Sequence, residues 1–264
     1  MKEFSFFKNR RSNASNEIRV NQISEFLGGK INPKNGYESD VCIYVKCIPP
    51  INHPEKSYID IIDQPSCIPW LLERSSIKVI TVSRITQKYV SKIISRDVIF
   101  LPQHHCNYLR ESRDRDEINV VGIIGSPDGE CAYNGLFDRL KKIGLNLIVC
   151  RNPRHRENVV NFYKTIDIQI AYRPQTLEWD KFHTSLKLVN ASSFGIPTVA
   201  YPEKSYIEEF DGCFLSALSE EDLFTNIKKL KEEPFLYEDL SERAKLRTEK
   251  YHIENIAKLY QQLL

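Results

Sequence analysis

The chain has 264 residues, 41% of them hydrophobic, which is enough for two modest α/β domains or one large one. A formal net charge of +2 argues against a surface that coats nucleic acid, so we expect no nucleic-acid partner. Seven cysteines without a CxxC pair, and an N-terminus without an apolar signal segment, predict reduced thiols and a cytoplasmic location.

Segments typical of strands and helices alternate along the first half of the sequence. Continuous apolar runs predict strands at residues 4–7, 41–45, 58–63, 79–83 and 98–101. Helical patterns lie between them, at about residues 15–27, 68–74 and 84–94. This alternation predicts a parallel, doubly wound sheet with helices on both faces.

A charged stretch, Arg110 to Glu117, follows this half and has no apolar face. We interpret it as a linker, so the two domains would join near Asn107–Glu117. A solvated loop within a single domain is the alternative. The expected domains are residues 1–108 and 117–250, followed by a C-terminal helix at residues 251–264.

The second half repeats the pattern. Strands are predicted at residues 120–124, 145–150, 166–171 and 198–200. Helical segments include residues 155–163, 220–231 and 236–264, the last broken near Tyr251 and His252. The fold class that these two halves predict is α/β, with two Rossmann-like parallel-sheet domains.

The stretch from Thr184 to Pro202 predicts a helix, a tight turn and a short buried strand. Ser185 is suited to cap the start of the helix, and Gly195 fits the left-handed position that ends one. Lys187 and Asn190 are three residues apart, so they share one face near the helix start. A cation, an amide and free N–H groups at that place suit a phosphate and a sugar hydroxyl.

This stretch resembles the donor-binding segment of GT-B glycosyltransferases, which has the form Lys-Leu-x-Glu-Ala-x-x-x-Gly-x-Pro-Val. The matching positions are Lys187, Leu188, Ala191, Gly195 and Pro197. Asn190 and Phe182 stand where the family usually has glutamates. The resemblance implies two domains facing a cleft, a last helix that crosses back onto the first domain, a nucleotide-diphosphate sugar as donor and no metal. It also implies that Asn190 faces the ribose, and that the short first domain lacks some strands.

Candidate donor residues in the second half follow from the rule that ligands bind beyond the carboxyl ends of parallel strands. The rule selects Ser126, Arg151, Arg173 and Lys187, and three of these are the cations that a diphosphate needs. Arg151 in a solvated loop is the alternative for that residue. His183 either reaches the donor sugar or caps the helix. The loop at residues 125–129 matches neither GxGxxG nor a P-loop.

Candidate catalytic residues in the first half are Asp63, His104 and His105, which end two predicted strands. An aspartate or a histidine can serve as general base on an acceptor hydroxyl. The alternative for the histidines is a hydrogen-bonded role at the joint between the domains. Because no third ligand occurs at a suggestive spacing, no metal site is expected.

These observations predict a glycosyltransferase that moves a sugar from a nucleotide-diphosphate sugar to a hydroxyl of a glycan, lipid-linked or protein acceptor. Two alternatives stay open: a catalytically silent binding subunit with the same fold, and a sugar-nucleotide epimerase of the same plan. Peripheral contact with a membrane and the oligomeric state also stay open.

Overall fold

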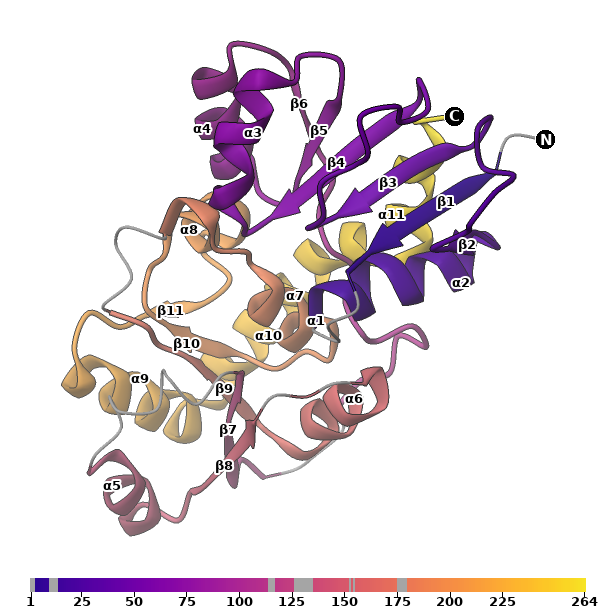
Figure 1. The fold of residues 1–264 in the computed structure, drawn as a ribbon. Coiled ribbons are helices and arrows are strands. Elements are labelled where there is room, and N and C mark those ends of the chain that lie inside the picture. The colour runs from indigo at the N-terminus through magenta and orange to yellow at the C-terminus, as the bar shows by residue number, and fades with distance from the viewer. Residues whose placement is uncertain are drawn as a thin grey trace. The chain divides into compact units, whose positions relative to one another are not determined.

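A computed structural model describes residues 3–9, 14–113, 117–125, 135–151, 153, 155–174 and 180–264. The chain forms two compact units, each with its own parallel sheet, which confirms the predicted fold class (Figure 1). Unit 1 comprises Met1–His104, Lys181–Thr184 and Ile253–Leu264. Unit 2 comprises His105–Asp180 and Ser185–His252, so the division falls directly after His104.

The described part of unit 1 contains six parallel strands in the order β2-β1-β3-β4-β5-β6. They are β1 (Phe4–Lys8), β2 (Lys30–Ile31), β3 (Val41–Val45), β4 (Ser57–Ile62), β5 (Lys78–Thr81) and β6 (Val98–Phe100). β3 and β4 are buried along their whole length, as continuous apolar runs predict for a sheet covered on both faces. The expectation that this domain lacks strands usual in the family stays a prediction; its described part contributes six strands to the sheet.

Helices cover both faces of this sheet (Figure 1). α3 (Ile68–Glu73) and α4 (Arg84–Ile94) pack on one face, against Ile59, Ile61 and Val79. The other face carries α1 (Ala14–Asn16), a π-helical segment at Glu17–Gln22 and α2 (Ile23–Leu27), together with the C-terminal helix α11 (Ile253–Gln261). Side chains alternate across a strand, so Asp60 points to the face opposite Ile59 and Ile61.

The C-terminal helix belongs to unit 1, as the resemblance predicted. Its Tyr260 ring packs edge-on against Phe4 and Phe6 of β1 and lies under the guanidinium of Arg19, 5.4 Å from the ring centre. Arg19 and Asp60 are fully buried and form an ion pair, with 2.6 Å between Nε and Oδ2. Arg19 also donates to the carbonyl of Pro102 at 2.9 Å. One buried cation therefore connects the π-helical segment, β4 and the chain leaving β6.

The described part of unit 2 contains five parallel strands in the order β11-β10-β9-β7-β8. They are β7 (Val120–Gly125), β8 (Asn146–Arg151), β9 (Ile168–Ala171), β10 (Thr198–Ala200) and β11 (Leu215–Ser216). The chain leaves β7 to form β8 on one side and then returns to form β9 on the other. The strand order therefore reverses between β7 and β9, the position where doubly wound sheets bind ligands.

Two layers of helices cover this sheet (Figure 1). α5 (Leu136–Lys142), α9 (Glu220–Glu232) and α10 (Pro234–Thr248) bury Val121 and Ile123 of β7 on one face. α6 (Arg156–Thr165) and α7 (Leu186–Ser193) cover Ile124 on the other. α8 (Lys204–Phe210) follows β10 and packs with α7 and α10. The sequence pattern missed the short elements α8, β2 and β11.

The amino edge of this sheet is held by Asp167, which is 1% exposed. Its carboxylate accepts the backbone N–H groups of Asn119 and Val120 and forms an ion pair with Arg113. The backbone N–H of Arg113 also donates to the carbonyl of Phe194. Arg113, expected in an interdomain linker, is thus packed onto unit 2.

Gly195 ends α7 in the left-handed conformation that the sequence predicted, with φ of +69°. A Cβ atom there would lie 2.8 Å from Ser241 Oγ, which donates to the Gly195 carbonyl, and 2.9 Å from Lys245 Cδ. Gly144 has a similar φ of +72°, but an added Cβ would meet only Lys231 Nζ, at 3.6 Å. Substitutions at these two glycines therefore distinguish the energetic cost of backbone strain from that of steric crowding.

We expect Gly195→Ala to lower the free energy of unfolding of unit 2 by about 1–2 kcal/mol more than Gly144→Ala. Both variants carry the left-handed strain, and only the first crowds α10. Urea unfolding of the two variants measures the difference. Equal losses would show that α10 yields to the new methyl group at no cost.

Candidate functional site

The predicted donor residues Lys187 and Arg173 both lie at the carboxyl edge of the unit 2 sheet, where the charge of Arg173 acts on the Lys187 amine. Gly125 ends β7 at the point where the strand order reverses. The Lys187 side chain reaches from α7 to this point, because a Cβ atom added to Gly125 would lie 3.4 Å from Lys187 Nζ. The amine thus lies at the place where an open α/β sheet binds its ligand.

The Lys187 amine is held in a desolvated and electropositive environment. Burial and the neighbouring guanidinium of Arg173 lower the pKa of Lys187 to about 8, and Glu203 opposes this shift. A second cation beside a buried amine is unfavourable without a ligand. A bound dianion would remove this repulsion, so the site is suited to a phosphate or diphosphate group.

Arg173 follows β9 and is held by a carboxylate that the sequence analysis did not select. Its Nε and Nη2 atoms donate to the two oxygens of Glu203, each at 2.7 Å, and the Arg173 side chain is 27% exposed. Nη2 also lies 3.4 Å from the hydroxyl of Tyr206. Glu203 comes shortly after the strand β10, so the strand-end rule that selected Arg173 could also have found it.

Other predicted donor residues have different surroundings. Ser185 precedes α7 but makes no cap there, because its hydroxyl donates to the carbonyl of Ser205 at 3.1 Å. Arg151 ends β8 opposite Gly125 and is exposed. Ser126 lies outside the described residues. Their roles at a donor site stay predictions.

Asn190 is 7% exposed, and its side-chain oxygen accepts the backbone N–H of Cys106 at 2.8 Å. Next along the chain, Asn107 donates from its amide to the carbonyl of Ser193 at 2.7 Å. These two amides bind the segment that enters unit 2 to α7. The oxygen that was expected to face a ribose is therefore engaged with the backbone, and the ribose contact stays a prediction.

Phe182 and His183 belong to unit 1. Phe182 is 3% exposed within the core that α3 and α4 cover, with its ring edge-on to Tyr89 at 5.5 Å. The position that usually carries a glutamate in the GT-B pattern thus serves packing in this chain. His183 is partly buried, and its predicted contact with a sugar stays untested.

The three candidate catalytic residues differ sharply in exposure. His104 and His105 are each 2% exposed; a ring nitrogen of His104 lies 3.2 Å from the carbonyl of Ile18, and the His105 ring packs against His252. These contacts favour the structural role for both histidines. Asp63 is 47% exposed and forms an ion pair with Lys46, so it is the candidate that solvent and an acceptor can reach.

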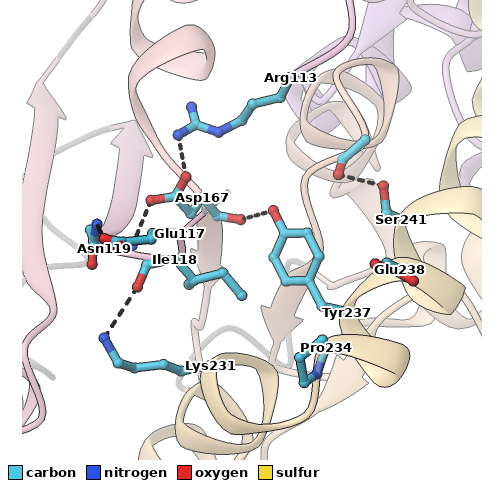
Figure 2. A pocket seen from close by; sticks show the side chains of 11 residues that line it. Arg113, Glu117, Ile118, Asn119, Asp167, Lys231, Pro234, Tyr237, Glu238 and Ser241 are labelled. Carbon is cyan, nitrogen blue, oxygen red and sulfur yellow. Dashed lines mark hydrogen bonds and ion pairs between the residues drawn. The ribbon is translucent and has the colours of Figure 1, made fainter. Parts of the chain in front are cut away.

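A pocket of about 420 Å³ lies at the amino edge of the unit 2 sheet (Figure 2). Figure 2 shows its polar groups joined to one another: Arg113 to Asp167, Tyr237 to the carbonyl of Asp167, and Lys231 to the carbonyl of Ile118. This edge is opposite to the one that carries Lys187 and Arg173, and its contacts hold loops together. We therefore place the candidate site at the carboxyl edge.

No protein-family model matches the sequence, and no curated protein matches it. Solved structures match over nearly the whole chain. HepE from Anabaena, solved in complex with UDP and glucose, is 9% identical, with a TM-score of 0.64 and 99% of each chain covered. WaaG, a glycosyltransferase involved in lipopolysaccharide biosynthesis, is 10% identical, with a TM-score of 0.62 and coverage of 97% of this chain and 99% of WaaG. An α-glucosyltransferase in complex with UDP is 11% identical, with a TM-score of 0.57 and 99% coverage of both.

These likenesses, together with two parallel sheets and a last helix that returns to unit 1, show that the chain has the GT-B fold. Identities of 9–11% establish the fold alone. No helix in the described part of the chain is long and apolar enough to cross a bilayer.

Proposed function

We propose that this protein is a glycosyltransferase that binds the diphosphate of a nucleotide sugar at Lys187 and Arg173. The observation that carries the proposal is the Lys187 amine at the reversal point of the unit 2 sheet, partly buried beside a second cation. The UDP and UDP-glucose held by the solved HepE structures support a nucleotide sugar as the ligand class.

In the proposed reaction the acceptor hydroxyl oxygen forms a bond to the anomeric carbon of the sugar. The bond from that carbon to the diphosphate breaks, and the nucleoside diphosphate leaves with the electron pair. Lys187 and Arg173 stabilise the negative charge that develops on the leaving group, which is the electrostatic contribution a preorganised site makes. Asp63 is our candidate to receive the hydroxyl proton, because it is the most exposed of the three proposed bases.

The experiment is a thermal-shift screen with UDP, GDP, CDP and ADP and with sugars linked to them. A ligand at a hundred times its dissociation constant stabilises the fold by about 2.7 kcal/mol. The four nucleosides without phosphates are the control and should give little shift. If no nucleotide in the panel stabilises the protein, the proposed donor site is wrong.

A second candidate is a binding subunit that holds a nucleotide sugar without transferring it. The observation that favours it is the burial of His104 and His105 at 2% exposure, which leaves two of three proposed bases out of reach of an acceptor. A turnover assay with the nucleotide sugar found in the screen and an acceptor distinguishes the two functions. Release of nucleoside diphosphate together with glycosylation of a glycan, lipid or protein supports transfer, whereas binding without release supports the binding subunit. Free nucleotide and an epimerised sugar would indicate the epimerase instead.

A further inference from the structure

Glu203 is almost fully buried, at 1% exposed, at the start of α8. It is a charged group, so its burial is costly unless a partner compensates it. The partner is Arg173, bound through both carboxylate oxygens at 2.7 Å each. A two-point contact of this kind fixes the plane of a guanidinium as well as its position.

The carboxylate binds the edge of the guanidinium that carries Nε and Nη2. The Nη1 edge of Arg173 therefore faces away from Glu203, and the Arg173 side chain keeps 27% of its surface exposed. The Lys187 amine lies at the same edge of the sheet, 3.4 Å from where a Cβ atom of Gly125 would be. Burial and the charge of Arg173 lower the pKa of Lys187, and the charge of Glu203 raises it. The site is thus a cluster of two cations and one buried anion, in which the anion contacts one cation directly.

We propose that Glu203 is a positioning residue of the donor site, which holds the Arg173 guanidinium in place beside Lys187 and offsets the repulsion between the two cations. The proposal rests on the proposed function, because it concerns the same donor site. Glu203 acts through Arg173 and Lys187 and makes no bond to the donor.

In the described part of unit 2, the charged and titratable groups around this cluster include residues of three segments. Arg173 follows β9, and Glu203 and Tyr206 belong to the start of α8. Asp180 lies before α7, and its carboxylate is within 4.8 Å of that of Glu203. Asp180 accepts the backbone N–H of Lys204 at 3.0 Å, so it holds the start of α8 in place.

The test is the affinity for a nucleoside diphosphate as a function of pH, measured by isothermal titration on the full chain. The probe is the tightest binder of UDP, GDP, CDP and ADP. In the parent protein, binding should weaken as the pH rises through about 8, where Lys187 loses its proton. Glu203→Gln removes the negative charge that favours the protonated form of Lys187, so binding should weaken at a lower pH than in the parent protein. At neutral pH the affinity should fall at least about tenfold.

Glu203→Asp is the conservative variant. It keeps the charge, so the pH at which binding is lost should stay close to that of the parent protein. Its shorter side chain no longer holds Arg173 at two points, so affinity should still fall. Because this variant retains the ion pair, it also serves if Glu203→Gln does not fold. A Glu203→Asp profile in which binding is lost at clearly lower pH than in the parent protein would overturn the proposal.

Glu221→Gln is the matched control. Glu221 also pairs with an arginine of unit 2, Arg139 at 3.0 Å, but on the surface. Its affinity and pH profile should equal those of the parent protein. If the parent binds and Glu203→Gln shows an unchanged affinity and profile, the role of Glu203 is wrong while the donor site stands. If the parent binds none of the four diphosphates, the proposed function itself has failed.

Discussion

Lys187→Met should weaken the binding of a nucleoside diphosphate by about 1.5–3 kcal/mol, the contribution of a hydrogen bond to a charged group. Methionine keeps most of the side-chain length and removes the amine that lies at the end of β7. The corresponding nucleoside, which lacks the phosphates, should bind as it does to the parent protein. Isothermal titration with both ligands measures the two effects, and Lys228→Met on the surface of α9 is the control.

The pH dependence of the same variant provides a second measurement. Lys187 has its pKa lowered from 10.5 to about 8, so its contribution to binding is present below pH 8 and lost above it. Lys187→Met should show no such loss. An equal decrease in affinity for nucleoside and diphosphate would instead mean that the substitution had damaged the fold.

Without ligand, the lowered pKa has the opposite consequence for stability. Between pH 8 and 10.5 the unfolded chain keeps this lysine protonated and the folded chain does not, so stability rises with pH across that window. Below the window the full cost of the buried charge remains. Lys187→Met should therefore unfold at a higher temperature than the parent protein at neutral pH. Such a gain is expected when a residue that serves binding lowers the stability of the fold.

Arg19→Met or Asp60→Asn should each lower the free energy of unfolding of unit 1 by about 3–5 kcal/mol. Each substitution leaves one buried charge without its partner, and both side chains are fully buried. The effect should reach the C-terminal helix, because Tyr260 packs under Arg19. Urea unfolding followed by Trp70 fluorescence in a Trp179→Phe background reports on unit 1 through α3.

The double variant Arg19→Met with Asp60→Asn is the informative comparison. Removing both charges abolishes the uncompensated burial, so the double variant should be more stable than either single one. Arg139→Met, which breaks an exposed pair with Glu221, should cost less than about 1 kcal/mol. Additive losses in the double variant would show that the two residues stabilise unit 1 separately.

The candidate site could be predicted in part from the sequence, because strand ends are local features. Arg173 follows an apolar run and Lys187 begins a helix that Gly195 ends, so a rule about strand ends selects both. The same rule could have selected Glu203, which comes shortly after β10, but no local pattern predicts its pairing with Arg173, 30 residues away. The two aspartates near the end of β4 show the same limit of a local sequence pattern. Asp63, the last residue of the predicted strand, is half exposed, whereas Asp60, inside the strand, is the one bound to Arg19.

The sequence by itself determined the two parallel sheets, the succession of the main strands and helices along the chain, and the left-handed turn at Gly195. These depend on apolar periodicity and on conformational preferences, which act over a few neighbouring residues. Only the tertiary structure decided which side chains meet. It buried His104 and His105, engaged the Asn190 oxygen with Cys106 and placed Phe182 in the core of unit 1. Each of these outcomes depends on contacts between segments far apart in the chain, which no local pattern encodes.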